Sequence, residues 1–392
     1  MTTSPALGQS LEEQIQELFK FLPARKHAVI DEPDTRFTLE DPLASITIID
    51  AGRGSSVFGY ADVDNFVLKP YADHIDGWVM GGVESLQATN VWYADLVFGG
   101  GVEDVHLERF DHSQLAVYGN VDNIELFDSV DSSFAFYGHT DDADVSWVQD
   151  SDLTFSEVGG VLEIDGVNDS AVQVGFADNA VIEIEDVQSL VVDIISADES
   201  EIELEETAGL ALKIDQGDVL LEGEDVSDST IDTGWGNDYV NLEEVTQTTI
   251  ATGMGNDDVM LSDADQTAVH TGAGDDFLTI NDQAGNAQVA YNLADGRDFG
   301  YIDGGNTLGM TLDGDTDTLV FNTADGGNHE VVADATDQLY LQTETGLWDA
   351  HLVDFIDQGG QDGVAQWEDF SLTIHTSVVE TVDVAHDDFF LG

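Results

Sequence analysis

Apolar residues recur in pairs two positions apart along most of this chain, and the pairs return about every 19 residues. A second series of pairs follows the first after about ten residues in each period. Because side chains two apart lie on one face of a β-strand, each period predicts two short strands. The first series contains Leu86/Ala88, Val105/Leu107, Ile124/Leu126, Ala143/Val145, Leu162/Ile164, Ile182/Ile184 and Ile202/Leu204, and the second contains Leu96/Phe98, Leu115/Val117, Phe134/Phe136, Leu153/Phe155, Val172/Val174, Val192/Ile194, Leu212/Ile214, Ile231/Thr233, Ile250/Thr252 and Val269/Thr271.

Two strands per period describe a flattened solenoid in which every coil adds one strand to each of two facing parallel sheets. No coil could bury its apolar pairs alone, so the coils must stack. We therefore expect an all-β fold, a parallel two-sheet β-solenoid over residues 41–311. About thirteen coils at about 4.8 Å per strand step give a rod roughly 60 Å long.

The ends of such a rod expose unpaired strand edges and need caps. Residues 1–40 are predicted to form an N-terminal helical cap, because Ser10-Leu-Glu-Glu13 has capping-box spacing and begins an apolar helical stripe that ends at Leu22. The stripe favours a packing helix over a membrane helix, since its polar face is acidic. The period fails from about residue 312 while strand-like alternation persists, so residues 312–392 are predicted to form a small C-terminal β cap.

The chain is strongly acidic, with 81 Asp and Glu against 9 Lys and Arg and a formal net charge of −72. This charge argues against a nucleic-acid partner, and the regular alternation of 42% hydrophobic residues argues against disorder. Two explanations of the charge stay open. Either the acids bind Ca²⁺, which prefers carboxylate and carbonyl oxygens, or they keep the protein hydrated in brine.

One motif recurs three times at 19-residue spacing, as Thr233-Gly-Trp-Gly-Asn-Asp238, Thr252-Gly-Met-Gly-Asn-Asp257 and Thr271-Gly-Ala-Gly-Asp-Asp276. Stacked coils would place its aspartates in a column beside glycine carbonyls, so that oxygens from neighbouring turns can surround a hard cation. The alternative is a solvated turn ladder that binds no metal. The predicted Ca²⁺ ligands are Gly234, Gly236, Asn237, Asp238, Gly253, Gly255, Asn256, Asp257, Gly272, Gly274, Asp275 and Asp276.

These turns resemble the RTX family, the haemolysin-type calcium-binding repeat proteins, whose nonapeptide is Gly-Gly-x-Gly-x-Asp-x-apolar-x. The resemblance covers residues 233–281 and implies a parallel β-roll that binds Ca²⁺ in its turns and folds outside the cell, where calcium is high. Two departures matter. The first motif glycine is Thr in every copy, and the opposite edge, such as Glu243-Glu-Val-Thr-Gln247, lacks the glycines and is expected to bind nothing.

Upstream coils carry a second polar column, Asp131-Ser132, Asp150-Ser151 and Asp169-Ser170, extended by Ser113 and Ser189. Such turns can satisfy one another's backbone groups or bind further Ca²⁺, and we favour the hydrogen-bonded ladder. Tyr118 and Tyr137 are one coil apart. A structural aromatic stack is favoured for this pair over sugar binding.

The sequence offers no catalytic motif. It has no cysteine, no His-Glu-x-x-His and no Gly-x-Ser-x-Gly elbow, so we expect a protein that is not an enzyme. No stretch approaches the length of a transmembrane helix, and the N-terminus lacks the zones of a cleavable signal peptide. Val382-Asp-Val-Ala-His-Asp-Asp-Phe-Phe-Leu-Gly392 resembles the uncleaved C-terminal signal of type I secretion substrates.

The function expected from these features is a secreted, calcium-binding structural protein that self-assembles outside the cell. It would form a surface layer (S-layer), a matrix filament or an adhesin subunit, in contact with copies of itself and with cell-surface polysaccharide. The alternatives are a polysaccharide-processing enzyme of lyase or epimerase type, or a soluble glycan- or ice-binding module. Ice binding would need flat threonine columns, but Thr233, Thr252 and Thr271 share the phase of inward residues.

Overall fold

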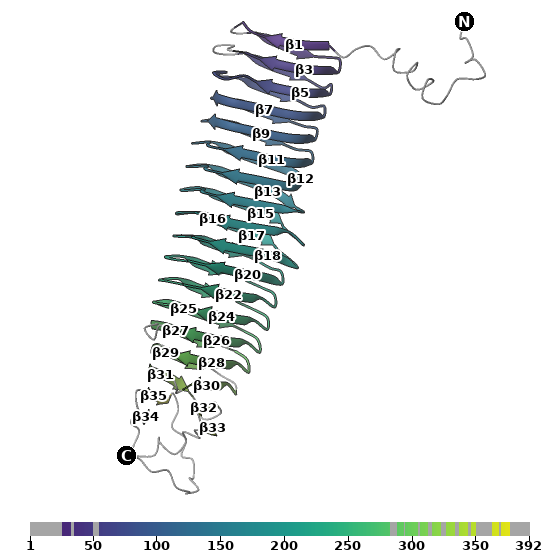
Figure 1. Ribbon diagram of the computed structural model, residues 1–392. Coiled ribbons are helices and arrows are strands. Elements are labelled where there is room, and N and C mark those ends of the chain that lie inside the picture. The colour runs from purple at the N-terminus through teal and green to yellow at the C-terminus, as the bar shows by residue number, and fades with distance from the viewer. Residues whose placement is uncertain are drawn as a thin grey trace, which may run out of the picture.

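The computed structural model describes residues 26–32, 35–49, 55–282, 288–293, 295–304, 306–312, 316–322, 327–333, 337–343, 346–349, 363–367 and 370–376. Within these ranges all regular secondary structure is β, and the strands stack into a long rod (Figure 1). The fold is an all-β parallel β-solenoid with coils of about 19 residues, as the hydrophobic pattern predicts, and it has about 15 coils rather than about thirteen.

Two sheets run along the rod, and the chain alternates between them. The first sheet contains, in spatial order, β1 (Lys26–Ile30), β3 (Leu43–Ile48), β5 (Val63–Leu68), β7 (Val83–Trp92), β9 (Val102–Asp111), β11 (Val121–Phe127), the second part of β12 (Ser133–Ser146), β14 (Val161–Asp165), β16 (Val181–Glu185), β18 (Ser200–Glu205), β20 (Val219–Glu224), β22 (Tyr239–Glu243), β24 (Asp258–Ser262), β26 (Phe277–Asp282), β28 (Phe299–Gly304), β30 (Thr318–Asn322) and β32 (Gln338–Thr343).

The second sheet contains β2 (Arg36–Leu39), β4 (Ser56–Gly59), β6 (Asp76–Val79), β8 (Asp95–Phe98), β10 (Gln114–Val117), the first part of β12, β13 (Asp152–Val158), β15 (Ala171–Phe176), β17 (Val191–Ser196), β19 (Ala211–Ile214), β21 (Thr230–Asp232), β23 (Thr249–Ala251), β25 (Thr267–Gly272), β27 (Gln288–Leu293), β29 (Asn306–Leu312), β31 (Gly327–Ala333) and β35 (Phe370–Thr376). Strand pairing along both sheets is parallel. Two antiparallel pairs occur near the C-terminal end, where β33 (Gly346–Asp349) pairs with β32 and β34 (Gly363–Trp367) pairs with β35.

The inward pairs form one continuous core between the sheets. In the first sheet Leu86 pairs with Val105, and Val105 pairs with Ile124, all in register and all buried. Burying such a side chain stabilises the fold by roughly 1.5–3 kcal/mol, so the stacked coils together supply the apolar burial that one coil cannot. The expected phase of both apolar series is thus confirmed.

Turns at the two edges of the rod differ in chemistry. At the serine edge, where the chain passes from the first sheet to the second, buried Ser113, Ser132, Ser151 and Ser170 stack in one column. Ser229 occupies the same position after two coils that have Leu190 and Leu210 there. Here two residues three apart have positive φ in successive coils, for example Asp128 and Asp131. The glycine edge is where the chain returns to the first sheet, and it contains the three glycine motifs.

The predicted helical cap over residues 1–40 is not supported. Lys26–Ile30 and Arg36–Leu39 are strands of the solenoid, and they pair in parallel with β3 and β4. The coils therefore begin before residue 41. The helix expected from Ser10 to Leu22 lies outside the described residues. Early coils repeat with irregular steps, since Ile30 pairs with Ile48 and Ile48 with Leu68, and this irregularity hid the first coil from a 19-residue template.

Parallel pairing also continues past residue 311, where the sequence period fails. Phe299 pairs with Thr318, and Thr318 pairs with Gln338. In the second sheet β31 pairs with β35, whose sequence lies far downstream because β32, β33 and β34 intervene. Loops of unequal length hid these coils, since a solenoid tolerates insertions in its turns. The stretch from Val382 to Gly392 lies outside the described residues.

Candidate metal centre at the glycine edge

The three glycine motifs stack in register at the glycine edge. Trp235 at the tip of the first turn pairs with Met254, and Met254 pairs with Ala273. Gly234, Gly253 and Gly272, which precede these tip residues, have φ of 81°, 94° and 94°. A left-handed backbone at this position favours glycine, and this explains why every copy carries Gly there.

The second motif glycine is required by close backbone approach. Gly255 and Gly274 have φ of 143° and 154°. A Cβ on Gly255 would lie 1.5 Å from the Gly236 carbonyl oxygen, and a Cβ on Gly274 would lie 1.5 Å from the Gly255 oxygen. Each carbonyl oxygen therefore faces the backbone one coil further on, in a space that no side chain can enter.

The motif aspartates form a buried column directly inside these turns. Asp238, Asp257 and Asp276 are 2%, 2% and 3% exposed. The backbone N–H of Val219 donates to Asp238 Oδ1 at 3.1 Å, that of Asp238 to Asp257 Oδ1 at 2.9 Å, and that of Asp257 to Asp276 Oδ1 at 2.9 Å. Each carboxylate thus satisfies the backbone of the coil before it.

The column extends beyond the three recognised motifs. The backbone N–H of Asp276 donates to Asp298 Oδ1 at 2.9 Å, and that of Asp298 donates to Asp317 Oδ1 at 3.0 Å. Both aspartates are buried. Sequence reasoning missed them because Asp276 and Asp298 are 22 residues apart rather than 19. The available signal was the pair Asp295-Gly-Arg-Asp298 and Asp313-Gly-Asp-Thr-Asp317.

The second oxygen of most column carboxylates accepts no hydrogen bond of normal geometry, although the neighbouring Thr252 and Thr271 hydroxyls offset part of the rise that burial causes in the pKa of Asp257 and of Asp276. Oδ2 of Asp257, of Asp276 and of Asp298 is buried and accepts no hydrogen bond from the described residues. Asp238 differs, because Thr233 Oγ1 donates to its Oδ2 at 2.5 Å. The equivalent Thr252 hydroxyl donates to the Thr271 carbonyl oxygen instead, at 2.8 Å. A buried charge without a partner is costly, so these oxygens call for a proton or a cation.

Burial changes the acidity of the same residues. Desolvation raises the pKa of Asp238 to about 7, that of Asp257 to about 6 and that of Asp298 to about 7. Burial also raises the pKa of Asp276. Neighbouring aspartates in the column add to the shift, since each negative charge disfavours the next.

The motif residues that precede the aspartates form a separate, outer column. Asn237 Oδ1 accepts the Asn256 N–H at 3.0 Å, and Asn256 Oδ1 accepts the Asp275 N–H at 2.9 Å. Asp275 accepts both the backbone N–H of Arg297 and its guanidinium, the latter at 2.7 Å, and this pairing lowers the pKa of Asp275. The structure therefore brings the predicted ligands together in two columns, and hydrogen bonds occupy the outer one.

The donor set at the inner column suits a hard cation. The possible ligands are carboxylate oxygens that accept no hydrogen bond and main-chain carbonyl oxygens of turns where only glycine fits. Ca²⁺ prefers both kinds of oxygen. Among the described residues no three side chains of His, Cys, Asp or Glu converge on one point. A cation here would therefore need main-chain oxygens as well as carboxylates from neighbouring coils.

The upstream Asp-Ser turns form a hydrogen-bonded ladder. The N–H of Ser113 donates to Ser132 Oγ at 3.2 Å, and the N–H of Ser132 donates to Ser151 Oγ at 3.0 Å. Ser132 Oγ donates in turn to the Phe110 carbonyl oxygen at 2.6 Å. Ser189 does not belong to the serine column, contrary to the expectation from the sequence. A 20-residue step pairs Ala171 with Val191 and places Ser189 beside the aspartate position.

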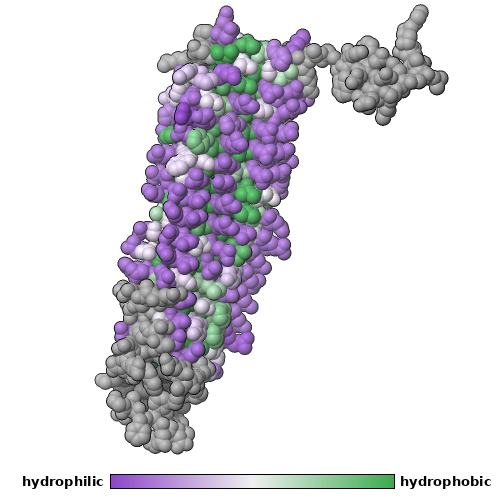
Figure 2. Space-filling model, viewed as in Figure 1, coloured by the Kyte–Doolittle hydropathy of each residue, from purple (hydrophilic) through white to green (hydrophobic). Residues whose placement is uncertain are grey.

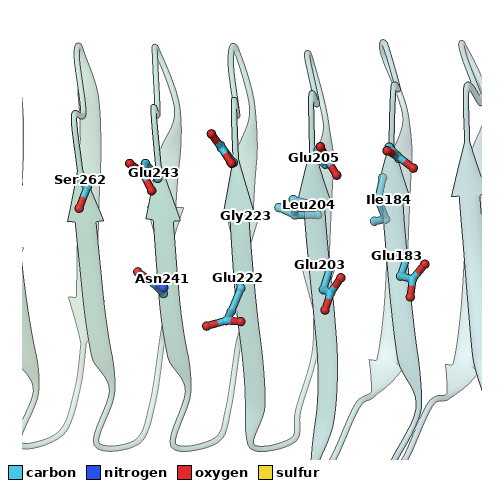
Figure 3. A pocket seen from close by; sticks show the side chains of 12 residues that line it. Glu183, Ile184, Glu203, Leu204, Glu205, Glu222, Gly223, Asn241, Glu243 and Ser262 are labelled. Carbon is cyan, nitrogen blue, oxygen red and sulfur yellow. The ribbon is translucent and has the colours of Figure 1, made fainter.

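A groove over the first sheet is lined by twelve residues, of which seven are glutamates (Figure 3). Glu183, Glu203 and Glu222 occupy one column, and Glu205 and Glu243 belong to the next column (Figure 3). Burial and the surrounding glutamates raise the pKa of Glu203. No Lys, Arg or aromatic ring lines this groove. The feature that would favour a lyase, aromatic rings beside a basic residue, is thus not found in its lining.

Three comparisons with known proteins give no relative. No protein-family model matches the chain, and searches of curated proteins and of solved structures find no match either. In the part of the chain that the structure describes, no helix is long and apolar enough to cross a bilayer.

Proposed function

We propose that this chain is a secreted, calcium-binding structural protein that self-assembles outside the cell. The observation that carries the proposal is the buried aspartate column, with Oδ2 of Asp257, Asp276 and Asp298 lacking donors. Five buried aspartates stacked one coil apart repel one another. A divalent cation between coils would remove that repulsion and join the coils.

Asp257, Asp276 and Asp298 are the side chains that would hold Ca²⁺, together with main-chain oxygens of the turns at Gly236 and Gly255. Bound Ca²⁺ would neutralise carboxylates that otherwise share protons at neutral pH, so its binding would release protons. Folding of the downstream coils would then depend on calcium. An environment rich in calcium outside the cell suits such a protein, and the RTX-like turns support this location.

Self-assembly is supported by the ends of the rod. Within the described residues β1 pairs only with β3, and β2 pairs only with β4, so one side of each strand is unpaired. At the other end β33 and β34 also have one unpaired side within those residues. Open edges favour pairing with another chain, and end-to-end pairing would give filaments or layers.

The test is a Ca²⁺ titration of the full-length chain after chelation, followed by circular dichroism, light scattering and electron microscopy. We expect β structure and ordered particles to appear together as Ca²⁺ is added. Asp257→Asn combined with Asp276→Asn should abolish the response. Asp150→Asn combined with Asp169→Asn, at the serine edge, is the matched control and should respond as the unaltered chain does.

Two outcomes would contradict the proposal in different ways. A protein whose spectrum and stability ignore Ca²⁺ would refute calcium binding. A protein that folds with Ca²⁺ but stays monomeric at every concentration would refute self-assembly, and lyase and epimerase assays on polysaccharides would then be the next step.

A further inference from the structure

The two outer faces of the rod differ in charge. On the first sheet, outward Glu125, Asp144, Glu163, Glu183 and Glu203 follow one another in register, and the face is mainly hydrophilic (Figure 2). On the second sheet, two of the three outward columns in β4, β6, β8, β10 and the first part of β12 contain no charged residue, and the third contains the exposed Asp76 and Asp95. The two uncharged columns stand out on a molecule with 81 acids.

We define the neutral strip by its exposed aromatic and sulfur-containing side chains and by the small residues between them. Its two columns follow the strand register through the coils from β4 to β12. The large exposed members are Tyr60, Trp78, Met80, Tyr118 and Tyr137, and the strip ends at the half-buried Phe58, whose ring centroid lies 4.9 Å from the Arg36 guanidinium. Between them, Val97, Ala116 and Ala135 form a low floor.

The shape of the strip is set by where its large side chains lie. Tyr118 and Tyr137 stack with ring centroids 4.8 Å apart and an interplanar angle of 20°. Next to Tyr118 in the same column is Gly99, which has no side chain. The Met80 sulfur leans over this glycine, 2.5 Å from where its Cβ would be. Methionine is flexible, so this place can adapt to a ligand beside the open face of Tyr118.

The sequence favours a structural stack of Tyr118 and Tyr137 over sugar binding, and the observed stack covers only one face of Tyr118. We propose that the neutral strip, with the other face of Tyr118, binds a neutral glycan chain. The C–H groups on one face of a pyranose ring form an apolar surface that packs on Trp and Tyr rings, while tyrosine hydroxyls remain available for hydrogen bonds. Trp78 and Tyr118, 51% and 57% exposed, provide such rings on either side of a shallow floor. An anionic polymer would be repelled by the rest of the chain, whose net charge is −72.

A second copy of the chain fits this strip less well. Five strands at about 4.8 Å spacing and a width of roughly 14 Å give an area of about 300 Å². A stable protein interface buries about 800 Å² on each partner. Two copies facing each other here would also bring two strongly acidic rods together. A polymer of sugars needs only the aromatic contacts and adds no charge.

Glycan binding would add a partner to the proposed function. It rests on that function in one respect, because the chain would meet such a polymer only outside the cell. The neutral strip and the aspartate column lie in different coils, so a failure of the glycan proposal can be distinguished from a failure of the calcium proposal. Loss of glycan binding would leave the calcium response intact. Loss of the calcium response would leave the strip in place, provided that the upstream coils stay folded.

The test measures retention of the full-length chain, with Ca²⁺ present, on insoluble cellulose, chitin and β-1,3-glucan, with alginate beads as the anionic probe. Trp78→Ala and Tyr118→Ala should each weaken binding to at least one neutral glycan about tenfold. Trp147→Ala is the matched control for Trp78. It removes a ring that is exposed to 53% but lies on the serine edge, and it should bind as the unaltered chain does.

Three results would overturn the proposal. The first is retention on none of the neutral glycans, and the second is equal retention on alginate. The third is equal loss of binding in Trp78→Ala and Trp147→Ala. Light scattering on the same samples tests whether a second copy of the chain binds the strip. A dimer that dissociates in Trp78→Ala would assign the strip to a second copy. Circular dichroism confirms that each variant is folded.

Discussion

Upstream and downstream coils share one backbone plan but fill the same inner position of the glycine edge differently. Upstream, this position is occupied by Ala180, Ser200 and Val219, which are buried without charge. The Ala180 N–H donates to Ser200 Oγ at 3.3 Å. Downstream, from Asp238 onward, the same position contains a buried carboxylate.

This difference shows that two similar hydrogen-bond ladders can differ in how strongly their stability depends on pH and on cations. A serine hydroxyl or an apolar side chain is buried neutral, so this position of the upstream coils needs no proton or cation. A buried carboxylate makes the same type of backbone hydrogen bond but adds a charge. Stability of the downstream coils should therefore depend more strongly on protons or cations than that of the upstream coils, whose titrating acids, such as Glu203, lie on the outer face of the first sheet.

The largest effect is expected where backbones are closest. Gly255→Ala places a Cβ 1.5 Å from the Gly236 carbonyl oxygen at a φ of 143°, so it should lower the free energy of unfolding by roughly 3 kcal/mol or more. Urea unfolding with Ca²⁺ present measures this loss. Gly309→Ala is the control, because nothing lies within 4 Å of a Cβ there. An unchanged midpoint for Gly255→Ala would contradict the stacked-turn geometry.

The next effect should change sign with calcium. Asp257→Asn keeps an oxygen for the Asp238 N–H but removes the buried charge. In chelator at neutral pH it should therefore stabilise the chain by about 1–3 kcal/mol, and with Ca²⁺ it should destabilise the chain relative to the unaltered protein. Thermal unfolding under both conditions measures the two signs. The same sign under both would show that Asp257 does not act through a cation.

The third prediction concerns pH. The pKa of Asp238 and that of Asp298 are raised to about 7 in the folded chain, above the value of about 3.9 in the unfolded chain. The folded chain then binds more protons between these values, so without calcium its stability should fall as pH rises through this range. Each such proton contributes about 1.4 kcal/mol per pH unit. Unfolding midpoints in chelator from acid to neutral pH measure the slope, and a rise would contradict it.

The smallest effect belongs to the upstream ladder. Ser132→Ala removes the acceptor of the Ser113 N–H and should cost about 1–2 kcal/mol, equally with and without Ca²⁺. Ser133→Ala, at the adjacent outward position, should cost much less. Urea unfolding of both variants makes the comparison. A calcium-dependent cost for Ser132→Ala would break the division between the two regions.

The sequence predicts most of the fold because the strand register of a solenoid appears in the sequence as a regular period. Inward pairs such as Leu162/Ile164 return at a nearly constant step, and each glycine of the motif marks a close backbone approach that leaves no room for a Cβ. The inward phase of Thr233, Thr252 and Thr271 is likewise confirmed, since all three are fully buried. The stacking of Tyr118 on Tyr137 also agrees with the one-coil spacing.

What the sequence did not predict depends on insertions and on neighbours one coil away. Asp298 belongs to the buried column although extra residues separate it from Asp276, and Ser189 leaves the serine column because of one added residue. A prediction that assumes a constant 19-residue period misplaces residues that follow such insertions. The different roles of Asn256 and Asp257 also depend on which backbone N–H each side chain meets in the adjacent coil.

The most direct test of the account is hydrogen exchange of the full chain, read by mass spectrometry with Ca²⁺ and after chelation at neutral pH. We expect peptides within residues 233–281 to lose protection when calcium is removed, while peptides within 83–219 keep theirs. Equal protection of both regions under both conditions, or equal loss in both, would contradict the claim that the aspartate column makes the downstream coils depend on a cation.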